Sequence, residues 1–237
     1  MIRVLVAPGG GAEGTRLALR DEESHHVRVR RGADGEMVEL RDGAGFVGLG
    51  RLIEAAKRWE VEVTRAERSE PPAELTLAVG AGDRDRFGWL AEKATELGVT
   101  AVIPLETERT SPVATRVRPQ NLERLRRHAL EAVKQSGAAW AARVEEPVSL
   151  AGLAAQPLVG RGWVADVGGE ELPAVVEAVP LVVVIGPEGG LTADEIDRLR
   201  GAGYLTVSLG PHTLRFETAA IAAAAAVSAG RRRRSHG

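Results

Sequence analysis

Cysteine is absent from this sequence of 237 residues, and so are the usual marks of export or membrane insertion. Without cysteine the chain can form neither a disulfide framework nor a cysteine-based zinc site, which is compatible with a reducing cytosol. No basic and then apolar stretch at the N-terminus indicates a secretion signal. No apolar run approaches the ~20 residues that cross a bilayer. We therefore expect a cytoplasmic protein that does not bind a membrane.

A basic excess is also missing, because the formal net charge is −2. Phosphate binding usually shows as a surplus of lysine and arginine, so any contact with nucleic acid must depend on local clusters. The densest cluster lies within residues 109–127, which contain six arginines and one acidic residue, Glu123. We predict phosphate contacts there. Its arginines are Arg109, Arg116, Arg118, Arg124, Arg126 and Arg127.

Paired prolines, Pro71 and Pro72, predict a boundary between two domains. Before them, short apolar segments separated by glycine turns are typical of a small β-barrel: 2–7, 27–31, 37–41, 46–53 and 59–64. After them, strand and helix patterns alternate, which predicts a parallel sheet covered on both faces. The expected strands are 75–80, 99–105, 158–166, 181–185 and 204–209, and the expected helices are 84–97, 121–134 and 172–178.

A glycine-rich loop follows the apolar strand expected at 181–185. Residues 186–190 contain three glycines, which let backbone N–H groups approach a ligand closely. Thr192 and Glu195 then have the spacing of a capping box at a helix start. Taken alone, the loop is equally compatible with a ligand site and with a simple turn. The chain lacks both G-x-G-x-x-G and the P-loop sequence, which argues against a nicotinamide-dependent oxidoreductase.

A second unusual loop, residues 208–215, follows the strand expected at 204–209 and opens another helix. Ligands of open α/β sheets bind beyond the carboxyl ends of the strands, so two such loops favour a binding site. The pair IGPEGGLT.DE and LG...LR.ETA resembles the signature of the 16S rRNA (uracil-N3)-methyltransferase family, in the SPOUT class of knotted methyltransferases. Either half alone is much less specific than the two in this order.

The resemblance implies an architecture that the residue patterns alone do not give. Residues 1–70 would form a PUA-like RNA-binding β-barrel, and residues 73–237 a SPOUT α/β methyltransferase domain with a trefoil knot. General rules of chain topology predict an ordinary open sheet instead, because threaded chains are very rare. The family also implies a homodimer, and the small side chains of 219–226 suit close packing against the sheet or a partner chain.

The implied cofactor is S-adenosyl-L-methionine, and no metal is needed because the cofactor carries its own electrophile. By resemblance, adenine would contact Leu209, Gly210 and Leu214, while ribose and methionine would contact the other loop. The residues expected there are Ile185, Gly186 and Gly190.

The implied partner is 16S rRNA of the small ribosomal subunit. Residues 27–31 alternate as in a strand, so Arg28 and Arg30 would share its open face beside Arg31. Taken alone, this pattern favours a solvated strand face, and only the resemblance favours RNA binding there. We place Arg109 and Arg116 in the second candidate contact with RNA. His25 and His26 would point in opposite directions from such a strand, so we predict no metal site.

The candidate catalytic residues are Arg215, which ends the second loop, and Glu217, which comes just after it. Uracil N3 carries a proton at neutral pH, so Arg215 could stabilise charge on the uracil oxygens, and Glu217 could orient Arg215 or assist proton removal. Alternatively, Arg215 binds phosphate and Glu217 only stabilises a helix start. Two other functions stay open: methylation of another RNA, for example a transfer RNA ribose, and RNA binding without catalysis.

Overall fold

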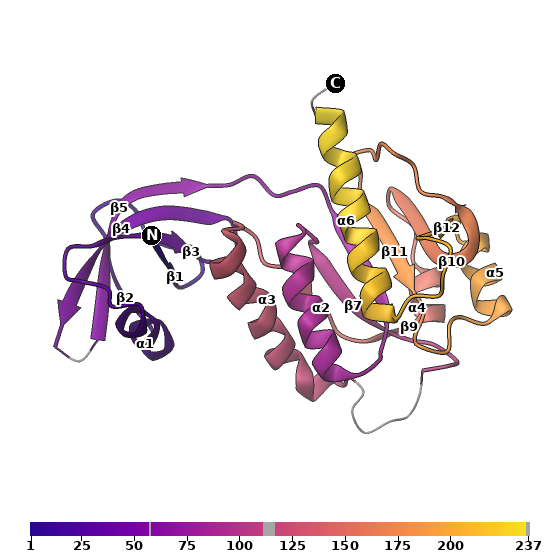
Figure 1. The fold of residues 1–237 in the computed structure, drawn as a ribbon, viewed down its shortest axis with the longest axis horizontal. Coiled ribbons are helices and arrows are strands. Elements are labelled where there is room, and N and C mark those ends of the chain that lie inside the picture. Colours follow the sequence, from indigo (N-terminus) through magenta and orange to yellow (C-terminus); the bar gives the residue numbers. More distant parts are fainter. Residues whose placement is uncertain (57, 111–116, 236–237) are drawn as a thin grey trace. The chain divides into compact units, whose positions relative to one another are not determined.

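The computed structural model describes residues 1–56, 58–110 and 117–235, and its contacts divide the chain into two compact units (Figure 1). The first unit contains Met1–Pro71 and Leu130–Ala141. The second contains Pro72–Ala129 and Ala142–Gly237. The sequence pattern did not predict that Leu130–Ala141 would pack with the N-terminal residues.

The first unit is built on a five-stranded mixed sheet with the order β1-β3-β4-β5-β2. Strands β1 and β3 are parallel, and the other neighbours are antiparallel. Alternate apolar residues such as Val4, Leu40 and Val61 form its core. The strands are β1 (Ile2–Leu5), β2 (Arg16–Ala18), β3 (Met37–Arg41), β4 (Phe46–Ala55) and β5 (Arg58–Arg68).

Helix α1 (Asp21–Val29) occupies the segment for which we predicted a strand, so that prediction is wrong. Three acidic residues open the helix, where the helix dipole favours negative charge. Val27 is fully buried but Val29 is 63% exposed, so the two valines do not share one face as they would in a strand. Arg28 therefore projects from a helix, and Arg30 is the residue that ends it.

The second unit contains a seven-stranded sheet in which every pairing is parallel, as the alternating pattern predicted. Its main path is β12-β10-β11-β6-β7-β8, and β9 pairs with β7. Strand β10 thus lies between β11 and β12. The strands are β6 (Leu75–Gly80), β7 (Ala101–Glu106), β8 (Arg143–Val144), β9 (Val148–Ser149), β10 (Arg161–Glu171), β11 (Leu181–Ile185) and β12 (Tyr204–Ser208).

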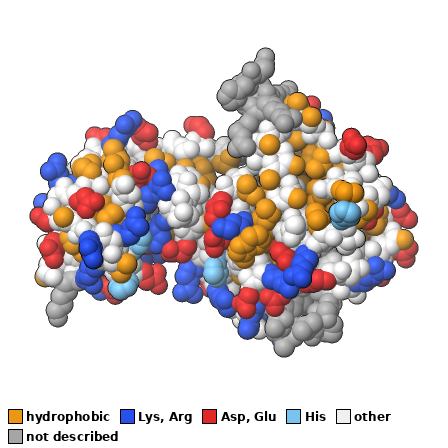
Figure 2. Space-filling view, viewed as in Figure 1, with side chains coloured by type: hydrophobic (Ala, Val, Ile, Leu, Met, Phe, Trp, Pro, Cys, Tyr) orange, Lys and Arg blue, Asp and Glu red, His pale blue; other side chains and the backbone are white. Residues whose placement is uncertain are grey.

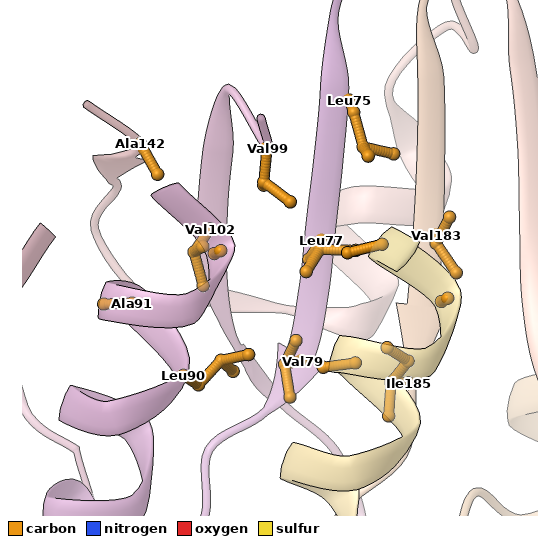
Figure 3. Packing of buried hydrophobic residues seen from close by; sticks show 14 of the residues in the cluster. Leu75, Leu77, Val79, Leu90, Ala91, Val99, Val102, Ala142, Val183 and Ile185 are labelled. Atoms are coloured by element: carbon orange, nitrogen blue, oxygen red, sulfur yellow. The ribbon is translucent and has the colours of Figure 1, made fainter. Parts of the chain in front are cut away.

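Helices cover both faces of this sheet, as predicted (Figure 1). Val183 packs in the apolar cluster that α2 and α6 share with the sheet, and its neighbour Val184 packs in the cluster on the side of α4 and α5. Figure 3 shows Leu77 and Val79 of β6 and Leu90 of α2 among the side chains of the cluster that contains Val183. The helices are α2 (Arg84–Glu96), a 3-10 turn η1 (Pro119–Asn121), α3 (Leu122–Ser136), α4 (Leu150–Ala155), α5 (Ala193–Gly201) and α6 (Phe216–Ser235). Only the first part of α3, up to Ala129, belongs to the second unit.

Two details of the second unit differ from expectation. The helix predicted at 172–178 does not form. Strand β10 instead continues to Glu171, and its pairing with β12 shifts register between Ala165 and Glu170. The short elements α4, β8 and β9 were not predicted because two to six residues carry too little periodicity. Within the described ranges, no helix is both long enough and apolar enough to span a membrane.

Candidate active site

The glycine-rich loop after β11 is folded tightly on itself. The N–H of Gly190 donates to the Pro187 carbonyl at 2.8 Å, and Gly190 has a φ of +70°, which favours glycine. A Cβ on Gly186 would lie 3.1 Å from the Gly190 carbonyl carbon, so a side chain there would press on the turn. The predicted capping box follows: the Thr192 hydroxyl accepts from the Glu195 N–H, and the Glu195 carboxylate accepts from the Thr192 N–H.

The loop after β12 depends on a different glycine. Gly210 has a φ of +144°, a conformation that residues with a side chain rarely adopt, and no atom would touch a Cβ at this position. The Ser208 hydroxyl accepts from the Gly210 N–H at 3.4 Å and donates to its carbonyl at 3.1 Å. Helix α6 then begins at Phe216, whose ring is buried and stacks on Phe87 with centroids 6.4 Å apart.

One cleft lies where these two loops meet the middle of β10 at Ala165, Asp166 and Val167, and its space of about 700 Å³ is partly open to solvent. Because β10 lies between β11 and β12, the walls of the cleft are formed by the carboxyl ends of β11 and β12 and by the middle of β10. The sequence-predicted cofactor residues all line it: Ile185, Gly186, Gly190, Leu209, Gly210 and Leu214. The two loops therefore lie together with open space between them, as a binding site requires.

Several residues of the cleft were not predicted. Asp166 and Glu188 bring carboxylates, and His212 and Thr213 bring further polar groups. Asp166 was detectable, since it is an acidic residue that directly follows the apolar part of a strand. Within the described ranges, no three or more His, Asp or Glu side chains are grouped as metal ligands.

The two candidate catalytic residues stand beside the cleft but do not line it. Arg215 is exposed. Glu217 is largely buried, and its Oε1 lies 3.5 Å from Nη1 of Arg86, while its Oε2 is buried without a hydrogen-bond partner among the described residues. The ion pair that positions Glu217 is thus with Arg86, which sequence reasoning had not considered.

The candidate RNA-binding residues lie in different places. Arg28, Arg30 and Arg31 are exposed on and just after α1. Arg109 is exposed, yet its guanidinium donates to the Gly189 carbonyl at 2.8 Å, so it contacts the glycine-rich loop. Arg116 lies outside the described residues. Figure 2 shows basic and acidic side chains interspersed on the face drawn, in keeping with the small net charge.

Comparison with known proteins gives the site its context. The model of an RNA methyltransferase domain family matches residues 69–228, more than half of the chain. The chain belongs to this RNA methyltransferase family. Ribosomal RNA small subunit methyltransferase E of Aquifex aeolicus is 31% identical over 88% of this chain and 92% of its own length. Its counterpart from Bacillus subtilis is 32% identical, over 91% of each chain.

A solved structure is also similar to this RNA methyltransferase over almost the full length of both chains. It is ribosomal RNA small subunit methyltransferase E of Neisseria gonorrhoeae bound to S-adenosyl methionine, with a TM-score of 0.85 and 29% identity. The match covers 95% of this chain and 96% of that one. The sequence-based assignment to an RNA methyltransferase family is therefore confirmed.

Proposed function

We propose that this RNA methyltransferase uses S-adenosylmethionine to methylate 16S rRNA of the small ribosomal subunit in the cytoplasm, at N3 of a uridine. The observation that carries the proposal is the single cleft lined by all six residues expected to bind the cofactor. The names of the similar ribosomal RNA small subunit methyltransferases, one of them bound to S-adenosyl methionine, support both substrate and cofactor.

The residues of the cleft fit this cofactor chemically. Glycines at 186, 190 and 210 leave room for a ligand to approach the backbone, and Ile185, Leu209 and Leu214 offer apolar contacts. Asp166 and Glu188 place negative charge in a cleft that would receive a cationic sulfonium and ammonium group. When bound, S-adenosylmethionine supplies an electrophilic methyl group, so the chain has only to orient it and prepare the acceptor.

Arg215 and Glu217 are the proposed catalytic residues. Arg215 projects from the loop beside the cleft and would stabilise negative charge on the uracil oxygens as N3 loses its proton. Glu217 has one carboxylate oxygen near Arg86 and a second, buried oxygen without a hydrogen-bond partner in the described part of the chain. That second oxygen can accept one more hydrogen bond, but it is buried and Glu217 does not line the cleft, so a local opening on RNA binding is required before it can accept the proton of the acceptor base.

RNA recognition is proposed for residues 1–70, as a PUA-like barrel, with Arg28, Arg30 and Arg31 on phosphates. Their exposure supports this role although they lie on and after a helix. Arg109 and Arg116 remain candidates for RNA contact. Residues 73–237 are proposed to be the SPOUT methyltransferase domain with a trefoil knot, acting as a homodimer without metal. The order β12-β10-β11, in which an earlier strand lies between two later ones, is compatible with a threaded connection.

Mass analysis of the modified nucleoside tests this proposal. The protein should transfer methyl groups to small subunits isolated from cells that lack the enzyme, and digestion should release 3-methyluridine from 16S rRNA. A methylated ribose, or methylation of transfer RNA instead, would show a different substrate. Cofactor binding without methyl transfer to any RNA would contradict catalysis. Comparing the rates of methyl transfer to naked 16S rRNA and to assembled small subunits would show which form is the substrate.

A further inference from the structure

A small turn after β7 lies against the glycine-rich loop. Residues 107–110 close it: the Thr110 hydroxyl accepts from the Thr107 N–H at 2.8 Å, and the Thr110 N–H donates to the Thr107 carbonyl at 3.1 Å. The two threonine hydroxyls are 2.9 Å apart. Because the turn is held at both ends, the residues between them, Glu108 and Arg109, are presented in a fixed position.

Glu195 joins this turn to the cofactor loop. It is only 5% exposed, and each carboxylate oxygen accepts a backbone N–H from a different segment. Oε1 accepts from Glu108 at 2.8 Å, and Oε2 accepts from Thr192 at 2.9 Å. Hydrogen bonds to a charged acceptor in a buried place are stronger than neutral ones, so this carboxylate connects the two loops firmly. The capping box alone uses only one of its two oxygens.

Arg109 adds a second connection from the same turn. Its Nη1 donates to the Gly189 carbonyl at 2.8 Å and lies 3.4 Å from the Leu191 carbonyl. A Cβ on Gly189 would lie 3.3 Å from the Arg109 Cβ, so glycine at 189 lets the arginine stem pack closely on the loop. Leu191, which carries one of these carbonyls, and Gly190, which lies between the two, both line the cleft.

We propose that Glu195 and Arg109 are positioning residues that hold the loop of residues 186–191 in the shape that binds the methyl donor. This inference rests on the proposed function, because it assigns these residues to the cofactor cleft. It also gives Arg109 a role other than the phosphate contact that the basic cluster suggested. Neither residue need touch the cofactor, since both act through the backbone of the loop.

The loop needs such support because three of the residues in 186–190 are glycines. Glycine-rich backbone has the largest conformational freedom, and ordering it during binding would weaken affinity. A loop held in place beforehand avoids that cost. Loss of the connections should therefore raise the Kd and KM for S-adenosylmethionine by a larger factor than the KM for RNA.

Two variants distinguish a positioning role in cofactor binding from a general contribution to folding. Glu195→Gln can still accept from the Thr192 N–H, as glutamine does in a capping box, but its amide would then place N–H groups against the Glu108 N–H. Arg109→Ala removes the second connection. Arg143→Ala is the matched control, because Arg143 is an exposed arginine of the same unit with one carboxylate partner, Glu145. All are studied in the full chain by calorimetric titration with S-adenosylmethionine and by a salt series with 16S rRNA.

We expect Glu195→Gln to weaken cofactor binding by about tenfold or more and Arg109→Ala by about threefold. The double variant should lose less than the product of the two, because both residues hold the same turn. Wild-type cofactor affinity in Glu195→Gln would overturn the proposal, and so would an Arg109→Ala protein that loses only RNA affinity together with part of its salt dependence. If the wild type itself fails to bind S-adenosylmethionine, the proposed function falls and this inference with it.

Discussion

Gly80, at the end of β6, should be essential for the shape of the cofactor cleft although it does not line the cleft. A Cβ at this position would lie 2.3 Å from the nitrogen of Pro187 and 2.7 Å from its Cα and Cδ. Atoms this close must separate, and two of the three belong to the backbone of the glycine-rich loop. Alanine at 80 therefore pushes the loop away from the sheet, and Pro187 itself lines the cleft.

The size of the effect follows from the overlap. Inserting a methyl group into a well-packed place costs about 1–3 kcal/mol. If that cost falls on the loop conformation that binds S-adenosylmethionine, the affinity of Gly80→Ala drops by about 5-fold to 150-fold. The change should be felt in cofactor affinity more than in RNA affinity, because the displaced loop belongs to the cleft.

Calorimetric titration of the full chain measures this loss. Gly201→Ala in α5 is the control, because no atom lies within 4 Å of the added Cβ and its φ is in the ordinary range. It should bind the cofactor like the wild type and be stabilised by up to about 1 kcal/mol, since alanine favours helix. A Gly80→Ala protein with unchanged cofactor affinity would refute the reasoning.

Three further predictions concern the second loop, the core and the first unit. Gly210→Ala should weaken cofactor binding about tenfold or more, with an unchanged circular dichroism spectrum, because φ is +144° and the added methyl group would occupy space through which the cofactor approaches the backbone. Leu77→Ala removes a fully buried side chain and should lower the free energy of unfolding, measured in urea, by about 2–5 kcal/mol. The hydrogen bond from Arg3 holds the pKa of Glu39 below its usual 4.5, so its stabilising contribution exists above that value and is lost as pH falls through the folded-state pKa. The stability difference between wild type and Glu39→Gln, measured in urea at neutral and acid pH, should therefore shrink in acid.

The elements that were predicted from sequence carry strong local signals. Strand β6 is an apolar run that ends in Gly80, and strand β11 is an apolar run that begins after Pro180. Both strands have the predicted limits in the structure. The capping box of α5 is likewise a local pattern with a local cause. Helix α1 was missed because Val27 and Val29 alternate like strand residues. The acidic first turn, and the burial of Glu23 and Val27 four residues apart, are instead typical of a helix.

The cleft shows the same division between local and distant signals. Its six predicted residues belong to two motifs, each contained in a short segment. By contrast, the contact of Gly80 with Pro187 and the hydrogen bond from Glu108 to Glu195 join segments far apart in the chain. No spacing rule reveals such pairs, because they arise only when parallel strands bring their carboxyl ends to one edge.

The central claim is that the loops of 186–190 and 209–215 together bind S-adenosylmethionine. A crystal structure of the full chain grown with this compound tests it most directly. The adenosyl and methionine groups should lie in the cleft, within contact distance of the backbone at Gly186, Gly190 and Gly210. Cofactor bound elsewhere on the chain, with this cleft left to solvent, would contradict it.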